Sequence, residues 1–395
     1  MRHQAGVIVA GIGNEAQMAE RRGRIGKPWG WIRAIVALLV AILAIASLLP
    51  FLHTNVWWVR FLSFPRVQFL CALAALLLIS IALPGRLRWY GVLTSAVAAA
   101  ALAVQSWTVV PYAAVAPVAA ASVGACPDEH RIRVLEANLQ MTNEHDDRLF
   151  KEIEAADPDV LLFEEVDAWW DAQFRQLHDR YPYSKHYVTQ NYYGITLLSR
   201  FPLILPEIRF LADSRDPAIF SGVTLPSGDD IRFYGIHPRP PTFGQSSAER
   251  DAVISAAALA IADDQAPAIL VGDMNATPWS PIVRRAARIG GLLDPRLGRS
   301  WYPTWKANAT LLRWPLDEML FSRHFALMDF RILPPFGSDH QPVLATLCFA
   351  PQLEQSVPKP EDGDIAAARA AVEAGQNAAA PSPEPAAGKQ APGTS

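Results

Sequence analysis

The sequence predicts an α+β body preceded by transmembrane α-helices. Between residues 131 and 349, short β-like runs alternate with helical ones and are bounded by Pro, Gly and Asp. Three long apolar stretches come before this region. Between two of the β-like runs, Ser227-Gly228-Asp229-Asp230 is typical of a hairpin turn. We therefore expect largely antiparallel sheets, and residues 126–350 suffice for one sizeable core.

The pattern places each element of the body. Eight runs rich in β-branched and aromatic residues predict strands at 132–138, 160–165, 195–199, 220–225, 231–237, 268–272, 316–321 and 343–349. Runs with helical spacing predict helices at 148–156, 169–179, 247–263 and 281–289.

Charge and hydropathy are unevenly distributed along the 395 residues. The chain is 51% hydrophobic with mean hydropathy +0.13, and its formal net charge is −3. Residues 1–125 carry a net charge of +8, whereas residues 126–350 carry −8. The near-neutral total therefore combines a basic, apolar front with an acidic body. An acidic body disfavours nonspecific gripping of nucleic acid, which usually needs clustered Lys and Arg.

Residues 1–125 predict a membrane anchor with about three transmembrane helices, at 31–52, 67–83 and 90–110. A cleavable signal peptide is the rival interpretation of the first stretch, but two further apolar stretches follow it. The second stretch is short and the third is rich in Ala, so a two-span anchor remains the alternative. An even number of spans would place the body on the other side of the membrane.

Basic residues predict the orientation of the anchor. Five of them lie before or at the start of the first stretch: Arg21, Arg22, Arg24, Lys27 and Arg33. Arg86 and Arg88 mark the second loop, and the positive-inside rule assigns both groups to the cytoplasm. Trp57 and Trp58 fit an aromatic belt at the interface. With three spans, this predicts a multi-pass inner-membrane protein whose body is periplasmic or otherwise extracytoplasmic.

The cysteines and the tail complete the organisation. Cys71 lies within an apolar stretch, whereas Cys126 and Cys348 lie near the two ends of the body. A disulfide between the last two and two buried free thiols are both open. Residues 351–395 are rich in Pro, Ala, Glu and Ser and predict a disordered tail, with a transient helix over 364–375.

Two short strings carry the candidate chemistry, Gly272-Asp273-Met274-Asn275 and Gly337-Ser338-Asp339-His340. Each string alone is typical of a polar turn whose side chains bond their own backbone. Four other polar residues also stand at ends of predicted strands: Asn138, Glu165, His237 and Asp317. Polar residues at so many strand ends predict one shared site.

The order of these residues resembles the endonuclease/exonuclease/phosphatase superfamily, which has the DNase I-like fold. The string from Pro158 to Glu165 resembles its metal-ligand strand, and the string from Gly194 to Pro202 resembles a strand shared across the family. The resemblance covers residues 131–349 and excludes the anchor and the tail. It implies a four-layer α/β/β/α sandwich and a hydrolase of phosphoester bonds.

The resemblance also implies a role for each residue. Glu165 would be the principal Mg²⁺ ligand, with Asn138 and Asp339 beside it, and Mn²⁺ is the alternative ion. Asp273 would orient or deprotonate the attacking water, and Asn275 would stabilise the pentacovalent phosphorus. His340, oriented by Asp317, would contact the phosphate or transfer a proton, and His237 would contact the phosphate.

The sequence departs from the family pattern beside the metal-ligand position and after His237. Glu164 stands where the family usually has Gln; because side chains alternate along a strand, we expect Glu165 in the cleft and Glu164 as a solvated or helix-capping carboxylate. Arg239 lies in the Pro-rich loop after His237, where a phosphate contact and a solvated loop position are both open.

The sequence as a whole thus predicts a membrane-anchored, Mg²⁺-dependent phosphodiesterase that is nuclease-like by family. Its substrate is expected to be nucleic acid, a phospholipid headgroup, a sugar phosphate or another small phosphodiester, and its other partner is the lipid bilayer; no protein partner can be inferred. A catalytically silent scaffold is the alternative from another class. It is disfavoured because Glu165, Asp273, Asn275 and His340 are all present.

Overall fold

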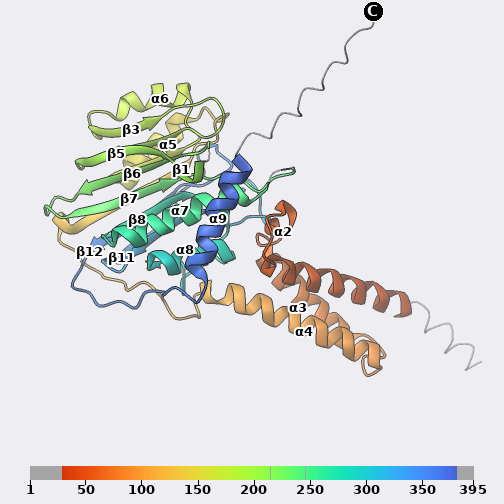
Figure 1. The fold of residues 1–395 in the computed structure, drawn as a ribbon. Helices are drawn as coiled ribbons and strands as arrows, with labels where there is room; N and C mark the ends of the chain where they lie inside the picture. The colour runs from red at the N-terminus through yellow and green to blue at the C-terminus, as the bar shows by residue number, and fades with distance from the viewer. Residues whose placement is uncertain (1–28, 214, 245, 380–395) are drawn as a thin grey trace, which may run out of the picture. The chain divides into compact units, whose positions relative to one another are not determined.

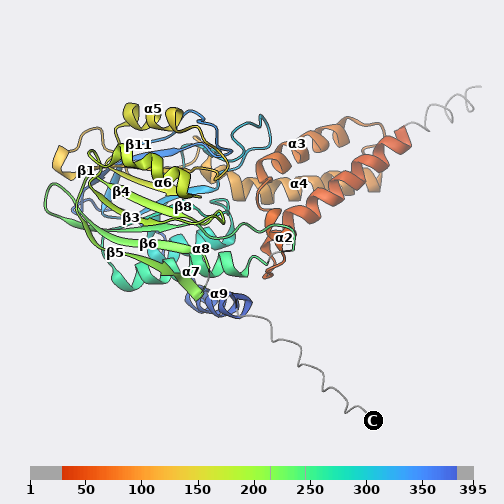
Figure 2. The same ribbon diagram turned by 90° about the horizontal axis from the view of Figure 1, so that it is seen from above.

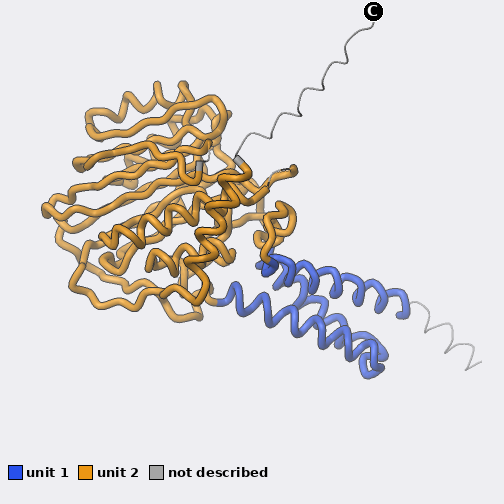
Figure 3. The backbone as a smooth tube through the Cα atoms, viewed as in Figure 1, with its two compact units in different colours: residues 1–52, 65–110 blue, residues 53–64, 111–395 orange. Residues whose placement is uncertain are grey.

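The computed structural model describes residues 29–213, 215–244 and 246–379. The chain divides into two compact units, which are described separately (Figure 3). Unit 1 comprises Met1–Leu52 and Pro65–Val110, and unit 2 comprises His53–Phe64 and Pro111–Ser395. Of the basic residues used to orient the anchor, Arg21, Arg22, Arg24 and Lys27 lie outside the described residues.

Unit 1 is built from apolar helices. Two helices are long and apolar enough to cross a membrane, Trp29–Phe51 and the one that contains α4 (Trp89–Val109) and continues to Tyr112. Between them, α3 (Arg66–Ala82) is apolar but has only 17 residues, the lower limit for a span. The predicted positions of the helices are confirmed, and both the two-span and the three-span counts remain predictions.

The interior of unit 1 is polar at one point. Gln105 donates a hydrogen bond from Nε2 to Ser47 Oγ at 2.7 Å, and Arg66 donates to Gln105 Oε1 at 3.2 Å. These three side chains are buried, whereas large apolar side chains such as Leu38 and Ile45 are 60% exposed. Buried polar side chains inside an apolar exterior are typical of helices that pack in lipid.

Unit 2 contains two six-stranded mixed sheets. The first has the order β11-β12-β1-β2-β4-β3, and the second has the order β5-β6-β7-β8-β10-β9. The strands of the first sheet are β1 (Arg131–Asn138), β2 (Val160–Glu164), β3 (Tyr183–Tyr187), β4 (Ile195–Ser199), β11 (Phe325–Ile332) and β12 (Val343–Phe349). Those of the second are β5 (Leu203–Phe210), β6 (Pro217–Thr224), β7 (Asp230–Ile236), β8 (Ala268–Asp273), β9 (Leu292–Leu293) and β10 (Asp317–Ser322).

The two sheets pack face to face, and helices cover their outer faces (Figures 1 and 2). Alternating apolar side chains from both sheets form the central core, for example Val134, Leu162 and Ile269. On the first sheet, α5 (Asp146–Ala156) and α6 (Ala168–Phe174) pack through residues such as Ile153 and Phe174. On the second, α7 (Ala248–Asp264) and α8 (Pro281–Gly290) form another apolar layer. The expected α+β class is confirmed.

All eight predicted strands form, within three residues of their expected ends, and the predicted hairpin joins β6 to β7. Gly228 adopts φ +91° in that turn, a conformation that glycine reaches without steric cost. The strands β3, β5, β9 and β11 were not predicted. Edge strand β3 (Tyr-Ser-Lys-His-Tyr) is exposed or half-buried and lacks the continuous apolar run of the central strands, whereas Pro206 interrupts the apolar pattern of edge strand β5.

Residues 364–379 form α9 (Asp364–Ala379), which packs on α7 and α8. The expected helix over 364–375 therefore forms, and it is a packed element rather than a transient one in a disordered tail. Asp364 accepts two hydrogen bonds from Arg288, at 2.7 and 2.8 Å. A side chain on Gly375 would meet Ala252 at 2.3 Å, so small residues let α9 and α7 approach closely. Residues 380–395, the rest of the expected tail, lie outside the described residues.

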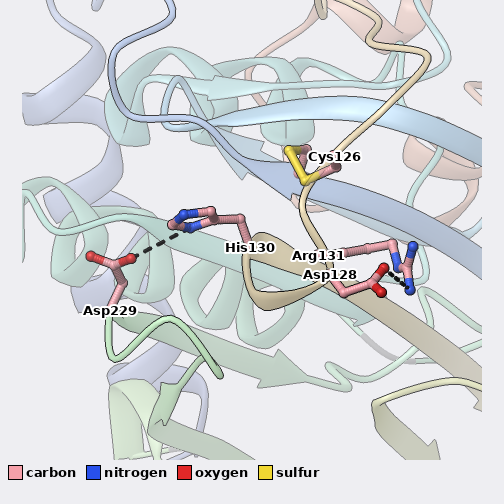
Figure 4. The surroundings of a disulfide bond; sticks show 6 residues. Cys126, Asp128, His130, Arg131 and Asp229 are labelled. Atoms are coloured by element: carbon pink, nitrogen blue, oxygen red, sulfur yellow. Dashed lines mark ion pairs between the residues drawn. A yellow bond between two sulfur atoms is a disulfide. The ribbon is translucent and has the colours of Figure 1, made fainter.

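The two cysteines near the ends of the body form a disulfide (Figure 4). Cys126 precedes β1, and Cys348 lies on the neighbouring strand β12, with 5.7 Å between the Cα atoms. Beside the bond, Arg131 pairs with Asp128 at 2.7 Å and His130 approaches Asp229 at 3.6 Å. Of the two alternatives left open by the sequence, the structure shows the disulfide; Cys71 is a free thiol.

Candidate active site

The candidate site forms where strands of both sheets end. Asn138 ends β1 and Glu165 directly follows β2, its parallel neighbour. In the other sheet Asp273 ends β8, and its register partner on β10 is Asp317. Since β1 and β2 pack against β8, the ends of the two sheets bring these side chains together.

His340 lies between two carboxylates. Its Nδ1 is 3.0 Å from both oxygens of Asp317, and its Nε2 is 3.6 Å from Asp273 Oδ2. All three side chains are buried. Although burial alone would lower it, Asp317 and Asp273 raise the pKa of His340 to about 10. The imidazole is therefore held as a cation between the two acids.

Three side chains of the site approach the same oxygen, Asp273 Oδ2. Asn138 Nδ2 donates to it at 3.2 Å, and the Nε2 atoms of His237 and His340 are 3.8 and 3.6 Å away. Burial raises the pKa of Asp273 to about 7, despite the opposing charge of His340. Burial, with the charge of His340, lowers the pKa of His237 to about 3, so His237 is neutral.

Asn275 is fixed by its own loop. Its backbone N–H donates to Asp273 Oδ1 at 2.8 Å, and its side-chain Nδ2 donates to the carbonyl of Pro238 at 3.0 Å. Its carbonyl accepts from the buried Arg250 at 3.2 Å. The backbone of Asn275 is left-handed, with φ +48°, a conformation that Asn tolerates better than most residues. This conformation directs the side chain to the same pocket as Asp273.

Glu165 faces Asn138 and the loop that follows β1. Its Oε1 accepts from Asn138 Nδ2 at 3.1 Å, and its Oε2 accepts from the backbone N–H of Met141 at 3.0 Å. Its backbone is also left-handed, with φ +59°. A non-glycine residue held in this conformation is uncommon and clusters at functional sites. Burial raises the pKa of Glu165, and the neighbouring charge of Asp339 adds to that rise.

Asp339 is held by three contacts. Its Oδ2 accepts from Trp305 Nε1 at 2.8 Å, its backbone N–H donates to Gln140 Oε1 at 3.0 Å, and its carbonyl accepts from Ala307 at 2.7 Å. Next to it, the Ser338 hydroxyl donates to the carbonyl of Asn138 at 2.8 Å. The loop before β12 is thereby tied to the end of β1.

The expected role of Glu164 as a solvated or capping carboxylate is wrong. Glu164 ends β2 and is completely buried, next to Glu136 of β1. Burial is the main cause that raises the pKa of both groups well above the usual range, and the charges of Asp317 and Asp273 add to it. The side chain points between the sheets because it alternates with Phe163, which packs under α6. Burial therefore favours the protonated form of this carboxyl pair.

Six of the eight predicted residues line one pocket of about 390 Å³: Glu165, His237, Asp273, Asn275, Asp339 and His340. Asn138 and Asp317 lie behind it and contact its lining residues. A larger hollow, lined by Arg209, Arg232 and Asp264 among others, contains no member of this set.

Sequence reasoning missed the apolar part of the pocket. Besides Leu316, the lining includes aromatic and proline side chains, Phe61, Phe64, Tyr192, Tyr193, Pro240, Pro241 and Trp305. The paired tyrosines and Trp305 are visible in the sequence, but nothing in their spacing predicts this position. Arg239 does not line the pocket: it is half-buried, pairs with Asp216 at 2.8 Å and lies over the ring of the lining residue Tyr193.

Comparison with known proteins gives one family. Residues 135–340 match the Endonuclease/Exonuclease/phosphatase family. A search of curated proteins found no match. Among solved structures, the human Nocturnin catalytic domain with bound sulfate has 22% identity and a TM-score of 0.47, over 57% of this chain and 97% of that one.

Two other solved structures are similar to a comparable share of this chain. An endonuclease/exonuclease/phosphatase from Beutenbergia cavernae has 19% identity and a TM-score of 0.45, over 56% of this chain and 72% of that one. TDP2 of D. rerio complexed with single strand DNA product has 17% identity and a TM-score of 0.47, over 55% and 98%. The family match covers more than half of the chain and includes every lining residue of the pocket except Phe61 and Phe64. The protein therefore belongs to the endonuclease/exonuclease/phosphatase family.

Proposed function

We propose that this phosphoester hydrolase is a Mg²⁺-dependent phosphodiesterase, anchored in a membrane with its pocket outside the cytoplasm. The family supplies the reaction class, hydrolysis of a phosphoester bond. The observation that carries the proposal is the position of Asp273 Oδ2, which meets Asn138, His237 and His340 at the floor of one pocket.

Asp273 is the proposed base. A base must lie within hydrogen-bond reach of the water whose proton it takes, and it works best with a pKa near the operating pH. Asp273 lines the pocket and its pKa is raised to about 7. Its other oxygen accepts from the backbone of Asn275, which fixes the carboxylate plane. We assign it the task of orienting the attacking water and accepting its proton.

Asn275 and the two histidines are the proposed phosphate-binding groups. His340 is cationic because Asp317 and Asp273 flank it, so it can donate from Nε2 to a phosphoryl oxygen or to the leaving oxygen. His237 is neutral and adds a second contact from the other side of Asp273. The amide of Asn275 donates to the charge that develops on phosphorus-bound oxygen.

Members of this family generally depend on a divalent metal, and the donor set here fits one. Glu165 and Asp339 line the same pocket, and the charge of Asp339 adds to the effect of burial in raising the pKa of Glu165, as expected when two carboxylates share a site without a cation. Carboxylate and amide oxygens are the ligands that Mg²⁺ prefers. We propose that Glu165 and Asp339 hold the ion, with Asn138 beside them. When bound, the ion polarises a phosphoryl oxygen and neutralises charge on the leaving group.

A second group also has ligand spacing. One ligand atom each from Asp273, Asp317 and His340 lies within 4.8 Å of the others. In this group, however, Nδ1 of His340 is already engaged by Asp317, and the imidazolium itself supplies the positive charge. We therefore place the metal at Glu165 and Asp339.

Two observations support the anchored, extracytoplasmic location. Residues 53–64, between the first two apolar helices, belong to unit 2, as does the chain after the third helix. One apolar helix precedes the first region and three apolar helices precede the second. If all three helices cross a membrane, both regions therefore lie on the same side of it. The disulfide between Cys126 and Cys348 is typical of proteins in oxidising compartments such as the periplasm.

The test is hydrolysis by the purified full-length chain. Bis(p-nitrophenyl) phosphate should be cleaved with Mg²⁺ and not with EDTA, and Asp273→Asn should lower kcat about 10²–10⁴-fold. Asp229→Asn, an exposed aspartate near the disulfide, is the matched control. Cleavage of p-nitrophenyl phosphate but not of the diester would replace the phosphodiesterase with a phosphomonoesterase. Absence of hydrolysis of either ester, with Mg²⁺ or Mn²⁺, would support the silent scaffold.

A further inference from the structure

One wall of the candidate pocket comes from the segment between the first two apolar helices. Residues His53–Phe64 belong to unit 2 and contain α2 (Trp57–Phe61). Phe61 and Phe64 line the pocket together with Asp273 and His340. The segment is more than 200 residues away in sequence from the loop that carries Asn275. It therefore belongs to the site and is not merely a connection between helices.

Polar contacts hold this segment against the body. Trp279 Nε1 donates to the carbonyl of Ser63 at 2.6 Å, and the Thr277 hydroxyl donates to the same carbonyl at 3.4 Å. At the start of the segment, the carbonyl of Asn55 accepts from the backbone N–H of Ser247 at 3.0 Å. Between these points, Arg60 pairs with Asp251 at 3.5 Å, and both side chains are largely buried. The two ends and the middle of the segment are thus fixed.

Aromatic packing completes the wall. The rings of Phe61 and Phe64 are 4.9 Å apart, and each is 6.0 Å from the ring of Trp314. Trp314 in turn packs on Trp305, the residue that donates to Asp339. The wall is therefore continuous with the loop that positions the proposed metal ligand.

The segment is short enough to keep the pocket close to the ends of the apolar helices. Phe64 is two residues before Arg66, where α3 begins. Two residues of extended chain span at most about 7 Å. If α3 enters a membrane, as proposed above, the pocket wall lies at the membrane surface whatever the arrangement of the two units.

The pocket lining favours a substrate with an apolar part. Its described lining residues include seven aromatic or proline side chains and no Lys or Arg. A nucleic-acid strand is bound chiefly through several basic contacts to phosphates. Three loops that contribute lining residues also carry exposed apolar side chains: Tyr192 is 48% exposed, Phe243 87% and Leu311 82%. Exposed apolar side chains grouped on such loops mark a surface that meets lipid or protein.

We propose that the substrate is the phosphoester of a membrane lipid and that the segment His53–Phe64 positions its apolar part. The occupant of the apolar rim is then the bilayer surface, to which the segment is tied at both ends by apolar helices. The inference rests on the proposed hydrolysis. The water oxygen bonds to phosphorus, the phosphorus–oxygen bond to the lipid alcohol breaks, and that alcohol oxygen takes a proton. The products are the lipid alcohol and a phosphorylated headgroup.

The experiment compares three substrates with the full-length chain reconstituted in vesicles of phosphatidylcholine, phosphatidylethanolamine and phosphatidylglycerol. Release of phosphorylated headgroup is measured beside hydrolysis of bis(p-nitrophenyl) phosphate and of single-stranded DNA, all with Mg²⁺. Lipid cleavage is expected, whereas DNA cleavage is expected to be slow. Phe61→Ala should lower kcat/KM for lipid about tenfold relative to kcat/KM for the small diester, since it removes part of a buried apolar contact.

A matched pair of surface variants tests the lipid inference without changing the packing of the pocket wall. Leu311 and Leu205 are 82% and 81% exposed, but only Leu311 belongs to a loop of the pocket. Leu311→Ser should raise the KM for vesicle lipid several-fold, and Leu205→Ser should not change it. Cleavage of the small diester or of DNA without cleavage of lipid, or equal effects of the two leucine variants, overturns the lipid inference and leaves the proposed hydrolysis standing. If no substrate is cleaved, the proposed function itself fails.

Discussion

Asp273 and Asp317 are register partners on the antiparallel strands β8 and β10, and their carboxylates hold His340 between them. Neighbouring strands therefore fix the two acids between which the imidazole from the loop before β12 is held. The arrangement gives the two acids different states: the pKa of Asp317 is lowered by its bond to His340 despite burial, whereas that of Asp273 is raised to about 7.

Asp317→Asn should separate the orienting role of this residue from a structural one. The amide removes the charge that keeps His340 protonated, so the pKa of His340 should fall and kcat should drop at least tenfold. NMR titration of the His340 imidazole and kcat on bis(p-nitrophenyl) phosphate measure the two effects. The control is Asp329→Asn on β11, whose partner Arg331 is exposed. A loss of activity with an unchanged His340 titration would contradict the assigned role.

The same substitution at Glu165 and at its neighbour Glu164 should change Mg²⁺ affinity to very different extents. Glu165→Gln removes a charged oxygen from the proposed metal site, so Mg²⁺ affinity should fall about tenfold or more. Glu164→Gln replaces a buried, protonated acid with a neutral side chain of similar shape and should change the affinity much less. Isothermal titration of Mg²⁺ into each variant gives the ranking. The reverse order would show that the ion is held by Glu164.

The contact between Arg288 of α8 and Asp364 should hold α9 on α8 in a pH-dependent way. Arg288 lowers the pKa of Asp364 below its ordinary value of about 3.8. The contribution is therefore complete above the unfolded-state pKa and is lost as pH falls through the lower, folded-state pKa. Hydrogen exchange should show α9 less protected in Asp364→Asn than in the wild type at pH 7.

The control for this effect uses the same charge at a more exposed position. Asp362→Asn, two residues earlier in the chain, should leave the protection of α9 unchanged. The difference between Asp364→Asn and the wild type should shrink in samples exchanged below about pH 4. A difference that stays constant over this range would mean that packing alone, with no help from the ion pair, holds the helix.

The disulfide gives a prediction about location. In cells, Cys126 and Cys348 should resist alkylation until a reductant is added, and a reporter fused after Phe349 should be active outside the cytoplasm. Cys126→Ser should lower the stability of the body by about 2–4 kcal/mol, measured by denaturant unfolding. Cys71→Ser is the control, because Cys71 is a free thiol. Free thiols at 126 and 348 together with a cytoplasmic reporter would favour an even number of spans.

The sequence predicted the central strands and the polar residues at their ends because both leave local signals. Buried strands such as β2 and β8 are continuous apolar runs, and their ends carry Asp, Glu or Asn. Edge strands such as β3 form because they pair with β4, although their own residues are half exposed. The burial of Glu164 depends on the second sheet, which no local pattern records.

The aromatic wall was beyond prediction for the same reason. Trp57 and Trp58 suit an aromatic belt on composition alone, yet the helix that contains them belongs to unit 2, and Phe61 lies in the pocket. The deciding contacts join Ser63 to Thr277 and Trp279, far along the chain. Likewise, the composition of the tail predicts at most a transient helix over 364–375, because the packing of α9 depends on Gly375 and Ala252, which meet across two helices.

If the apolar helices anchor the chain as we propose, proteolytic release from the membrane would separate the body from the segment His53–Phe64. A protease that cuts between α4 and β1 would free a fragment with every proposed catalytic group but without Phe61 and Phe64. Such a fragment would expose Trp279 and Trp314, which the segment covers. With the proposed anchoring, shedding is therefore expected to lower the activity rather than spread it, and hydrolysis stays confined to the membrane surface.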